Sequence, residues 1–253
     1  AAASATVSAA PGRGVGMTSP LQLTWGRAST GWRFGRKTHA DAGMGRRYDA
    51  AQWSLVGGGA VRVAGVVLAG GASSRMGRPK QLIQVGGRTL LQRAVDALLE
   101  GGVQEVVVVL GADAAEVITG LGAHPGVRTV MNSAHATGQS SSVRAGINAL
   151  DDGVDAAVMM VSDRPYVTAD AVREVVRAAA DSPEHEVAIA QYTDGQGHPV
   201  LLRRAIWPQL MLLRGDVGAR AVLPMAHVLP VPVPDHMPRD VDTPDDLSEV
   251  VEG

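Results

Sequence analysis

The sequence contains no cysteine and few aromatic residues, and each absence excludes a class of chemistry. Without cysteine there are no disulfides, no thiolate metal sites and no cysteine nucleophiles, and a reducing compartment is compatible with this composition. One Phe and three Tyr among 253 residues argue against the stacking surfaces with which proteins hold single-stranded nucleic acid. We therefore expect neither thiol chemistry nor a nucleic-acid partner.

An excess of one charge and long apolar runs are missing as well. The 23 Lys and Arg residues are balanced by 25 Asp and Glu residues, so net charge does not favour nucleic acid or an anionic membrane as a partner. No apolar run reaches the roughly 18 residues of a membrane helix. We expect a cytoplasmic protein that is long enough for a substantial core.

Residues 1–60 differ in composition from the rest of the chain. They are rich in Ala, Gly, Ser and Thr, their basic residues outnumber their acidic ones, and three of the four tryptophans lie there without a periodic apolar pattern. We expect a dispensable extension ahead of a single domain over residues 61–253. A disordered tail, an organellar transit peptide and an over-translated start are the three alternatives.

From residue 61 onward, apolar runs alternate with amphipathic segments. The runs at 63–68, 105–110 and 156–161 are typical of strands buried on both faces. Helical spacing predicts helices over 89–100, 113–121, 141–150 and 168–180, a short helix around Trp207 and another over 215–223. Further strands are expected at 128–132, 186–191, 197–202 and 228–233, the last being a proline-punctuated edge. This order predicts an α/β fold with a doubly wound, mostly parallel, Rossmann-like sheet.

The first of these strands leads into an unusual loop. The segment from Val63 to Lys80 reads VAGVVLAGGASSRMGRPK. Gly70 and Gly71 allow the backbone to approach a ligand closely with its N–H groups accessible, and Arg75 and Lys80 add fixed positive charge. The spacing matches neither the dinucleotide fingerprint nor the P-loop. We interpret the loop as a cradle for the phosphates of a nucleotide; a strand followed by a flexible basic loop is the alternative.

Two aspartates are candidates for a magnesium site. Asp163 follows the apolar run at 156–161, and Asp242 precedes a helix start at Thr243 and Pro244. Ligands of open parallel sheets bind beyond the carboxyl ends of the strands, where both carboxylates could meet the glycine loop. Mg²⁺ takes one or two protein oxygens together with phosphate oxygens. Alternatively, Asp163 only caps a turn and Asp242 only supports a helix start.

Four segments in this order resemble a known enzyme family. They are LAGGASSRMGRPK at 68–80, the turn at 163–165, GHPV at 197–200 and DVDTP at 240–244. Together they resemble the nucleotidyltransferases of molybdenum cofactor maturation over residues 63 to 250, and the cytidylyltransferase branch more than the guanylyltransferase branch. The resemblance implies the nucleotide-diphospho-sugar transferase type of fold and a Mg²⁺ cofactor. It implies transfer of a nucleotidyl group from a nucleoside triphosphate, with CTP favoured, to a phosphorylated acceptor, molybdopterin cofactor, with release of pyrophosphate. A molybdoenzyme that receives the product is a further implied partner.

The resemblance also implies roles for individual residues. Nucleotide-binding roles fall on Leu68, Ala69, Gly70, Gly71, Arg75, Lys80, Asn132, Gly138, Ser140 and Ser142. Acceptor-binding roles fall on Arg164, His198, Asp216 and Arg220. Catalytic roles fall on Arg75, Lys80 and Asp163, and metal-binding roles on Asp163 and Asp242. For each of these residues an ordinary loop, capping or structural role is the alternative. Arg164 departs from relatives, which often carry Met or Gln there; its cation either reaches the acceptor phosphate or points away.

Three other functions remain open at this point. One is a sugar-phosphate or other small-phosphate nucleotidyltransferase on the same scaffold. Another is an NAD(P)H-dependent oxidoreductase on that scaffold, against which the missing dinucleotide fingerprint and the presence of Lys80 argue. The third is a non-catalytic carrier of the cofactor, in which both aspartates would be expected to be lost; both are present.

Overall fold

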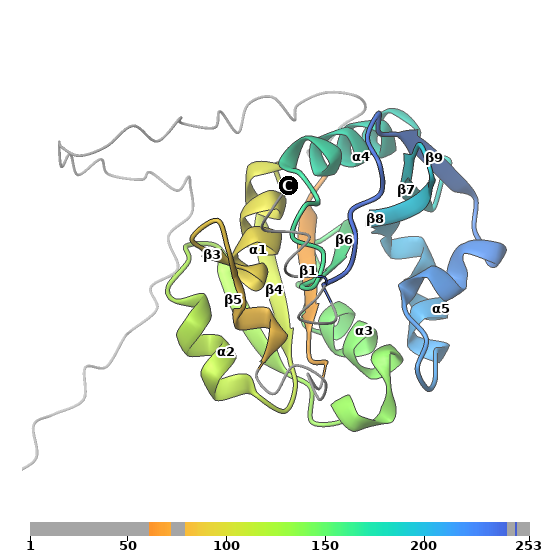
Figure 1. The fold of residues 1–253 in the computed structure, drawn as a ribbon. Coiled ribbons are helices and arrows are strands. Elements are labelled where there is room, and N and C mark those ends of the chain that lie inside the picture. Colours follow the sequence, from red (N-terminus) through yellow and green to blue (C-terminus); the bar gives the residue numbers. More distant parts are fainter. Residues whose placement is uncertain (1–60, 72–78, 242–245, 247–253) are drawn as a thin grey trace, which may run out of the picture. The chain divides into compact units, whose positions relative to one another are not determined.

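A seven-stranded sheet organises the computed structural model, which describes residues 61–71, 79–241 and 246 (Figure 1). The strand order is β5-β4-β1-β6-β8-β7-β9. The strands are β1 (Val63–Ala69), β4 (Glu105–Leu110), β5 (Val127–Met131), β6 (Ala156–Val161), β7 (Val187–Tyr192), β8 (Gly195–Arg203) and β9 (Val228–Pro232). β8 runs antiparallel to both of its neighbours, and the other pairs are parallel. The predicted mostly parallel, Rossmann-like sheet is confirmed.

Helices cover both faces of this sheet and enclose two hydrophobic cores. The helices are α1 (Leu90–Glu100), α2 (Ala114–Leu121), α3 (Gln139–Asn148), α4 (Ala169–Asp181) and α5 (Trp207–Leu212). Side chains of α1, α2 and α4 pack into one core, and those of α3 and α5 into the other. Along β1, Val67 belongs to the first core and Val66 to the second. The buried runs of the sequence are therefore central strands with apolar contacts on both faces.

Threonines cap two helices, close to the positions where the sequence predicts that these helices begin. At α1, Thr89 Oγ1 accepts a hydrogen bond from the Gln92 amide (3.1 Å), and Gln92 Oε1 accepts one from the Thr89 amide (3.0 Å). This reciprocal pair is a capping box. At α4, Thr168 Oγ1 accepts a hydrogen bond from the Ala171 amide (3.1 Å). These caps fix the residue at which each helix begins.

Some elements differ from the expectation. A small hairpin of β2 (Gln84–Val85) and β3 (Arg88–Thr89) was not predicted, because two-residue strands show no alternation. It turns through Gly86 and Gly87, whose φ angles are +61° and +78°. The predicted helix over 215–223 is instead a 3-10 helix, η5 (Ala219–Met225), which contains Pro224 and begins four residues later.

Several predictions concern residues outside the described part of the chain. The extension at 1–60, Arg75, Asp242 and the helix start at Thr243 belong to this group. The domain boundary at residue 60 therefore stays a prediction. Among the helices that the structure describes, none combines the length and the apolar character required to cross a membrane.

Candidate functional site

A cleft of about 780 Å³ opens at the carboxyl ends of β1 and β6. Its walls come from the end of β1, the short 3-10 helix η2 (Lys80–Leu82), the segment before α3 and the turn after β6. Eight of the predicted site residues line it: Leu68, Gly70, Gly71, Lys80, Gly138, Ser142, Asp163 and Asp216. The structure therefore brings Gly70 and Gly71 together with a lysine and an aspartate, at the carboxyl ends of the strands where the fold predicts a ligand.

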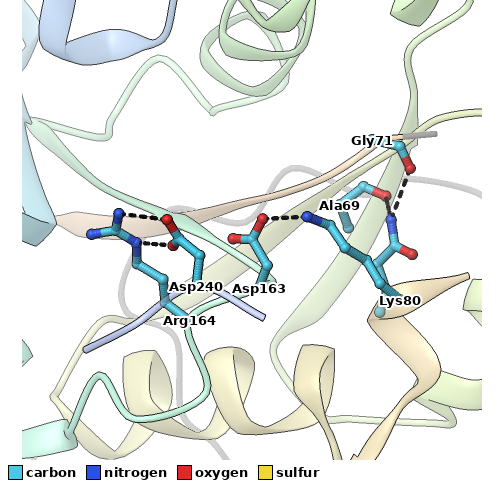
Figure 2. A network of polar contacts seen from close by, with 7 residues as sticks. Ala69, Gly71, Lys80, Asp163, Arg164 and Asp240 are labelled. Carbon is cyan, nitrogen blue, oxygen red and sulfur yellow. Dashed lines mark hydrogen bonds and ion pairs between the residues drawn. The ribbon is translucent and has the colours of Figure 1, made fainter. Parts of the chain in front are cut away.

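An ion pair lies across this cleft. Lys80 Nζ is 2.5 Å from Asp163 Oδ2, with the two side chains 17% and 20% exposed (Figure 2). The other carboxylate oxygen, Asp163 Oδ1, is buried and has no hydrogen-bond partner within the described residues. A buried oxygen without a partner is costly unless a cation or donor joins it, so Asp163 Oδ1 could serve as a ligand of a metal ion.

The end of β1 is packed too closely for larger residues. A Cβ atom on Gly111 would lie 2.3 Å from the Gly70 carbonyl oxygen, and one on Gly70 would lie 3.3 Å from Ser142 Oγ. By contrast, no atom of the described residues lies within 4 Å of the position where a Cβ on Gly71 would stand. Gly70 is thus packed closely against neighbouring segments of the chain, and both Gly70 and Gly71 line the cleft.

Gln81 supports this loop and was missed by sequence reasoning. Its side chain is 1% exposed, and its Nε2 donates to the carbonyls of Ala69 (2.8 Å) and Gly71 (3.3 Å). Figure 2 labels Ala69 and Gly71, where these two hydrogen bonds end. The amide draws both carbonyls toward η2, which settles the orientation of the peptides between them. The only signal in the sequence was its place directly after Lys80, and a polar residue there gives no hint of burial.

Asn132 and Ser140 lie behind the cleft and are not among its lining residues. Asn132 is 4% exposed, and its Nδ2 donates to Ser141 Oγ (2.8 Å) and Ser142 Oγ (3.0 Å). Ser140 is 1% exposed, and its amide donates to the Gly215 carbonyl (3.2 Å). Both residues therefore hold the first turn of α3 in place, while Ser142 reaches the cleft wall.

A loop from far along the chain covers the start of α3. Gly138 has a φ of +105°, and a Cβ there would lie 2.4 Å from the carbonyl carbon of Gly215. Asp216 Oδ1 accepts a hydrogen bond from the Gln139 amide (3.2 Å). Asp216 therefore both caps α3 and lines the cleft, and Gly138 is required for the close contact between the two segments.

Arg164 occupies a second groove instead of the main cleft. The groove encloses about 470 Å³ and is also lined by His236, Arg239 and Asp240. The Arg164 guanidinium contacts both carboxylate oxygens of Asp240, with 3.0 Å from Nη2 to Oδ2 (Figure 2). Beside this pair, the Val241 amide donates to the Asp163 carbonyl (2.9 Å). These contacts hold the segment before residue 242 against the Asp163 turn.

His198 is a neutral group close to these charges. Its Nδ1 lies 3.0 Å from the Met159 carbonyl, so Nδ1 carries the proton and donates. Burial lowers the pKa of His198 to about 4, and the nearby Arg164 and Arg220 lower it further against the raising effect of the Met159 carbonyl and Asp163. At neutral pH the ring therefore offers hydrogen bonding without positive charge. Neither His198 nor the exposed Arg220 lines either cleft.

The donors in the cleft suit a hard divalent cation. Within the described residues no cluster of three or more acidic or histidine side chains gathers. Mg²⁺ does not require such a cluster, because it keeps several waters and uses one or two carboxylates plus substrate phosphates. Asp163, with its unpartnered Oδ1, fits that pattern.

Comparison with known proteins identifies a matching family and relatives of more than one named activity. The family model of the MobA-like NTP transferase domain matches residues 65–230. The chain is similar to nicotine blue oxidoreductase of Paenarthrobacter nicotinovorans, with 35% identity over 170 residues, 64% of this chain and 81% of that protein. It is also similar to molybdenum cofactor guanylyltransferase of Rhizobium johnstonii, with 34% identity over 208 residues, 74% of this chain and 90% of that protein.

A solved structure also resembles the chain. Rv0371c of Mycobacterium tuberculosis superposes with a TM-score of 0.69 and 29% identity, covering 77% of this chain and 100% of that one. A manganese complex of the same protein gives a TM-score of 0.62 and 27% identity, over 76% of this chain and 99% of that one. A divalent ion is thus bound by a protein of similar fold and sequence.

Proposed function

Because the chain belongs to the family of MobA-like NTP transferases and is therefore a nucleotidyltransferase, we propose that it transfers CMP from CTP to a phosphorylated acceptor, molybdopterin cofactor, with Mg²⁺ and with release of pyrophosphate. The observation that carries this proposal is the pair of Lys80 and Asp163 in a cleft bordered by Gly70 and Gly71. A cation for phosphates, a carboxylate for a metal ion and an accessible backbone are what phosphoryl chemistry of this kind requires.

On the donor side, the chain's own residues would bind and orient the triphosphate. The backbone from Leu68 to Gly71 contacts the nucleotide, and Lys80 stabilises the charge that develops on pyrophosphate, assisted by Arg75. The acceptor phosphate attacks the α-phosphorus in line, so positioning accounts for most of the rate and no covalent enzyme intermediate is needed.

The metal ion, when bound, would neutralise phosphate charge and act as a Lewis acid at the α-phosphate. We assign it to Asp163, through the unpartnered Oδ1, and to Asp242. Asp242 follows Val241 directly in the sequence, and the Val241 amide donates to the Asp163 carbonyl. This contact is the support for grouping the two aspartates.

The remaining predicted residues divide into direct and indirect roles in this proposal. Gly138 and Ser142 line the cleft and would contact the base and the ribose, whereas Asn132 and Ser140 would act by holding the first turn of α3. On the acceptor side, we propose contacts from His198, as a neutral hydrogen-bonding ring, and from Asp216 and Arg220, whereas Arg164 acts through its pair with Asp240.

A thermal-shift screen tests the donor. CTP, GTP, ATP and UTP are compared with and without Mg²⁺, because a ligand that binds only the native state raises Tm by mass action. We expect the largest shift with CTP, dependent on Mg²⁺, and pyrophosphate release that falls by orders of magnitude in Lys80→Ala. A larger shift with GTP would indicate that GTP is the donor. An unchanged rate in Lys80→Ala would show that Lys80 has no role in the reaction.

One relative favours a second candidate. Its name, nicotine blue oxidoreductase, describes redox chemistry in a protein 35% identical to this chain. NADH and NADPH therefore form further arms of the screen. A shift with either one and none with any nucleoside triphosphate would favour an oxidoreductase. A CTP response without turnover of molybdopterin, but with turnover of a sugar phosphate, would favour the sugar-phosphate alternative.

A further inference from the structure

The two carboxylate oxygens of Asp163 lie in different surroundings. Oδ2 is held by Lys80 Nζ at 2.5 Å, and Oδ1 is buried without a partner among the described residues. The lysine ammonium therefore stands at one of the two oxygens that a divalent ion would use. Both groups are mostly buried, so the pair is screened less by water than an exposed one.

The ammonium group of Lys80 has two possible anionic partners. In the proposed function it neutralises the triphosphate, and in this structure it neutralises Asp163. A single ammonium donates at most three hydrogen bonds, and a triphosphate carries more negative charge than one carboxylate. The four-carbon stem of lysine allows the ammonium to move between partners while the backbone stays in place. The buried Gln81, bonded to the Ala69 and Gly71 carbonyls, anchors that backbone.

We propose that Lys80 is an exchangeable counter-ion of Asp163 that makes metal binding depend on the nucleotide. Without nucleotide, Lys80 occupies Asp163 and opposes the divalent ion both by contact and by charge. When the triphosphate binds, it draws Lys80 onto its phosphates and leaves both Asp163 oxygens to the metal ion. The two ligands therefore bind cooperatively, and by linkage each raises the affinity of the other by the same factor. The inference rests on the proposed function, because it takes Asp163 as a metal ligand.

Titration with Mn²⁺, followed by electron paramagnetic resonance, tests this without any turnover. The full-length chain and Lys80→Met are titrated with Mn²⁺ alone and again with the α,β-methylene analogue of CTP. Without nucleotide we expect Lys80→Met to bind Mn²⁺ about tenfold more tightly than the parent chain, the size expected for losing one charge-assisted competitor. With the analogue bound, we expect this difference to shrink.

Further variants separate contact from general charge effects. Lys80→Arg keeps the cation and is expected to bind Mn²⁺ no more tightly than the parent chain. Arg88→Met removes a cation that is 54% exposed and pairs with Asp96, so it is expected to leave Mn²⁺ affinity unchanged. An equal gain in Lys80→Met with and without the analogue would indicate a charge effect alone and would overturn the inference, as would no gain at all. Lys80→Gln is the second neutral variant if Lys80→Met melts at a lower temperature.

Asp163→Asn separates failure of the inference from failure of the proposed function. If Mn²⁺ binding is lost in Asp163→Asn but is unchanged in Lys80→Met, Asp163 is a ligand and the exchange mechanism is wrong. If Asp163→Asn binds Mn²⁺ as the parent chain does, the metal assignment itself is wrong.

Discussion

At the scale of single residues, Gln81 shows how a neutral side chain shapes a charged site. Its side chain carries no charge, yet its Nε2 donates to the carbonyls of Ala69 and Gly71, beside the cleft. If those carbonyls turned toward the ligand, they would repel phosphate oxygens. The donor at this position thus favours an anion by removing competing acceptors, and its chemistry, more than its size, is what matters.

Gln81→Glu tests this at constant size. The exchange replaces the donating Nε2 with an oxygen that repels the Ala69 and Gly71 carbonyls, so we expect nucleotide affinity to fall by about tenfold or more, as for a lost buried hydrogen bond with an added unpaired charge. Isothermal titration with the α,β-methylene analogue of CTP measures it.

Gln104→Glu is the matched control for this exchange. There the Oε1 accepts from the Val63 amide (2.7 Å), a role that glutamate keeps, so nucleotide affinity should not change. Equal affinities in the parent chain and in Gln81→Glu would exclude a positioning role for Gln81.

At the scale of elements, the segment after β9 (residues 233–241) forms a tether, a stretch of chain that is bonded to the turn at Asp163. Arg164 and Asp240 join the Asp163 turn to this segment, and Val241 is fully buried against Ile83 and Leu90. The backbone hydrogen bond between Val241 and Asp163 runs beside the ion pair. The arginine that the sequence left ambiguous is thus engaged within the protein, and it positions the chain that leads to Asp242.

Breaking this tether should affect catalysis more than stability. For Arg164→Gln we expect kcat to fall between about tenfold and a hundredfold, because small misplacements of a reacting group have effects of this size. We expect only a small decrease in Tm, because Asp240 is 42% exposed and gains water when unpaired. Pyrophosphate release measures kcat.

The control and the rescue variants for this prediction also change arginine–carboxylate ion pairs. Arg177→Gln breaks an exposed pair with Glu174 on α4 and should leave kcat unchanged. Exchanging the two charges, Arg164→Asp together with Asp240→Arg, should recover part of the loss. A kcat equal to that of the parent chain in Arg164→Gln would show that the tether has no role in the reaction.

At the scale of the whole molecule, the described residues that form the two large hydrophobic cores and the cleft all lie beyond residue 60. The two cores share the central strands β1, β4 and β6, whose side chains alternate between them. Each fully buried Val or Leu contributes roughly 1.5–3 kcal/mol to such a core. A chain that begins at residue 61 contains all of these contacts.

Deleting residues 1–60 should therefore leave the protein folded and able to bind nucleotide. We expect Tm to change by no more than about 2 °C, less than a loss of 1 kcal/mol would cause in a domain of this size. The CTP-dependent thermal shift should also persist. Differential scanning calorimetry of the two chains measures both values, and a large decrease in Tm would mean that the tryptophans of this region pack onto the domain.

Most strands and helices could be predicted, because each depends mainly on residues that are close together in the sequence. The apolar runs at 105–110 and 156–161 coincide with β4 and β6, and Thr89 and Thr168 mark the starts of α1 and α4. The hairpin at Gly86 and Gly87 could not be predicted, because its strands are too short to show a period.

The sequence by itself determined the fold class, because the periodicity of strands and helices is a local signal. The motifs, the glycine loop among them, likewise determined the family resemblance and the types of residue expected at the site. Only the tertiary structure decided which groups meet. Lys80 and Asp163 are 83 residues apart, and Arg164 and Asp240 are 76 apart. The order of strands in the sheet brings such pairs together, and periodicity along the chain does not encode that order. The burial of Gln81 and the withdrawal of Asn132 behind the cleft depend on packing between elements, which is likewise a property of the assembled fold.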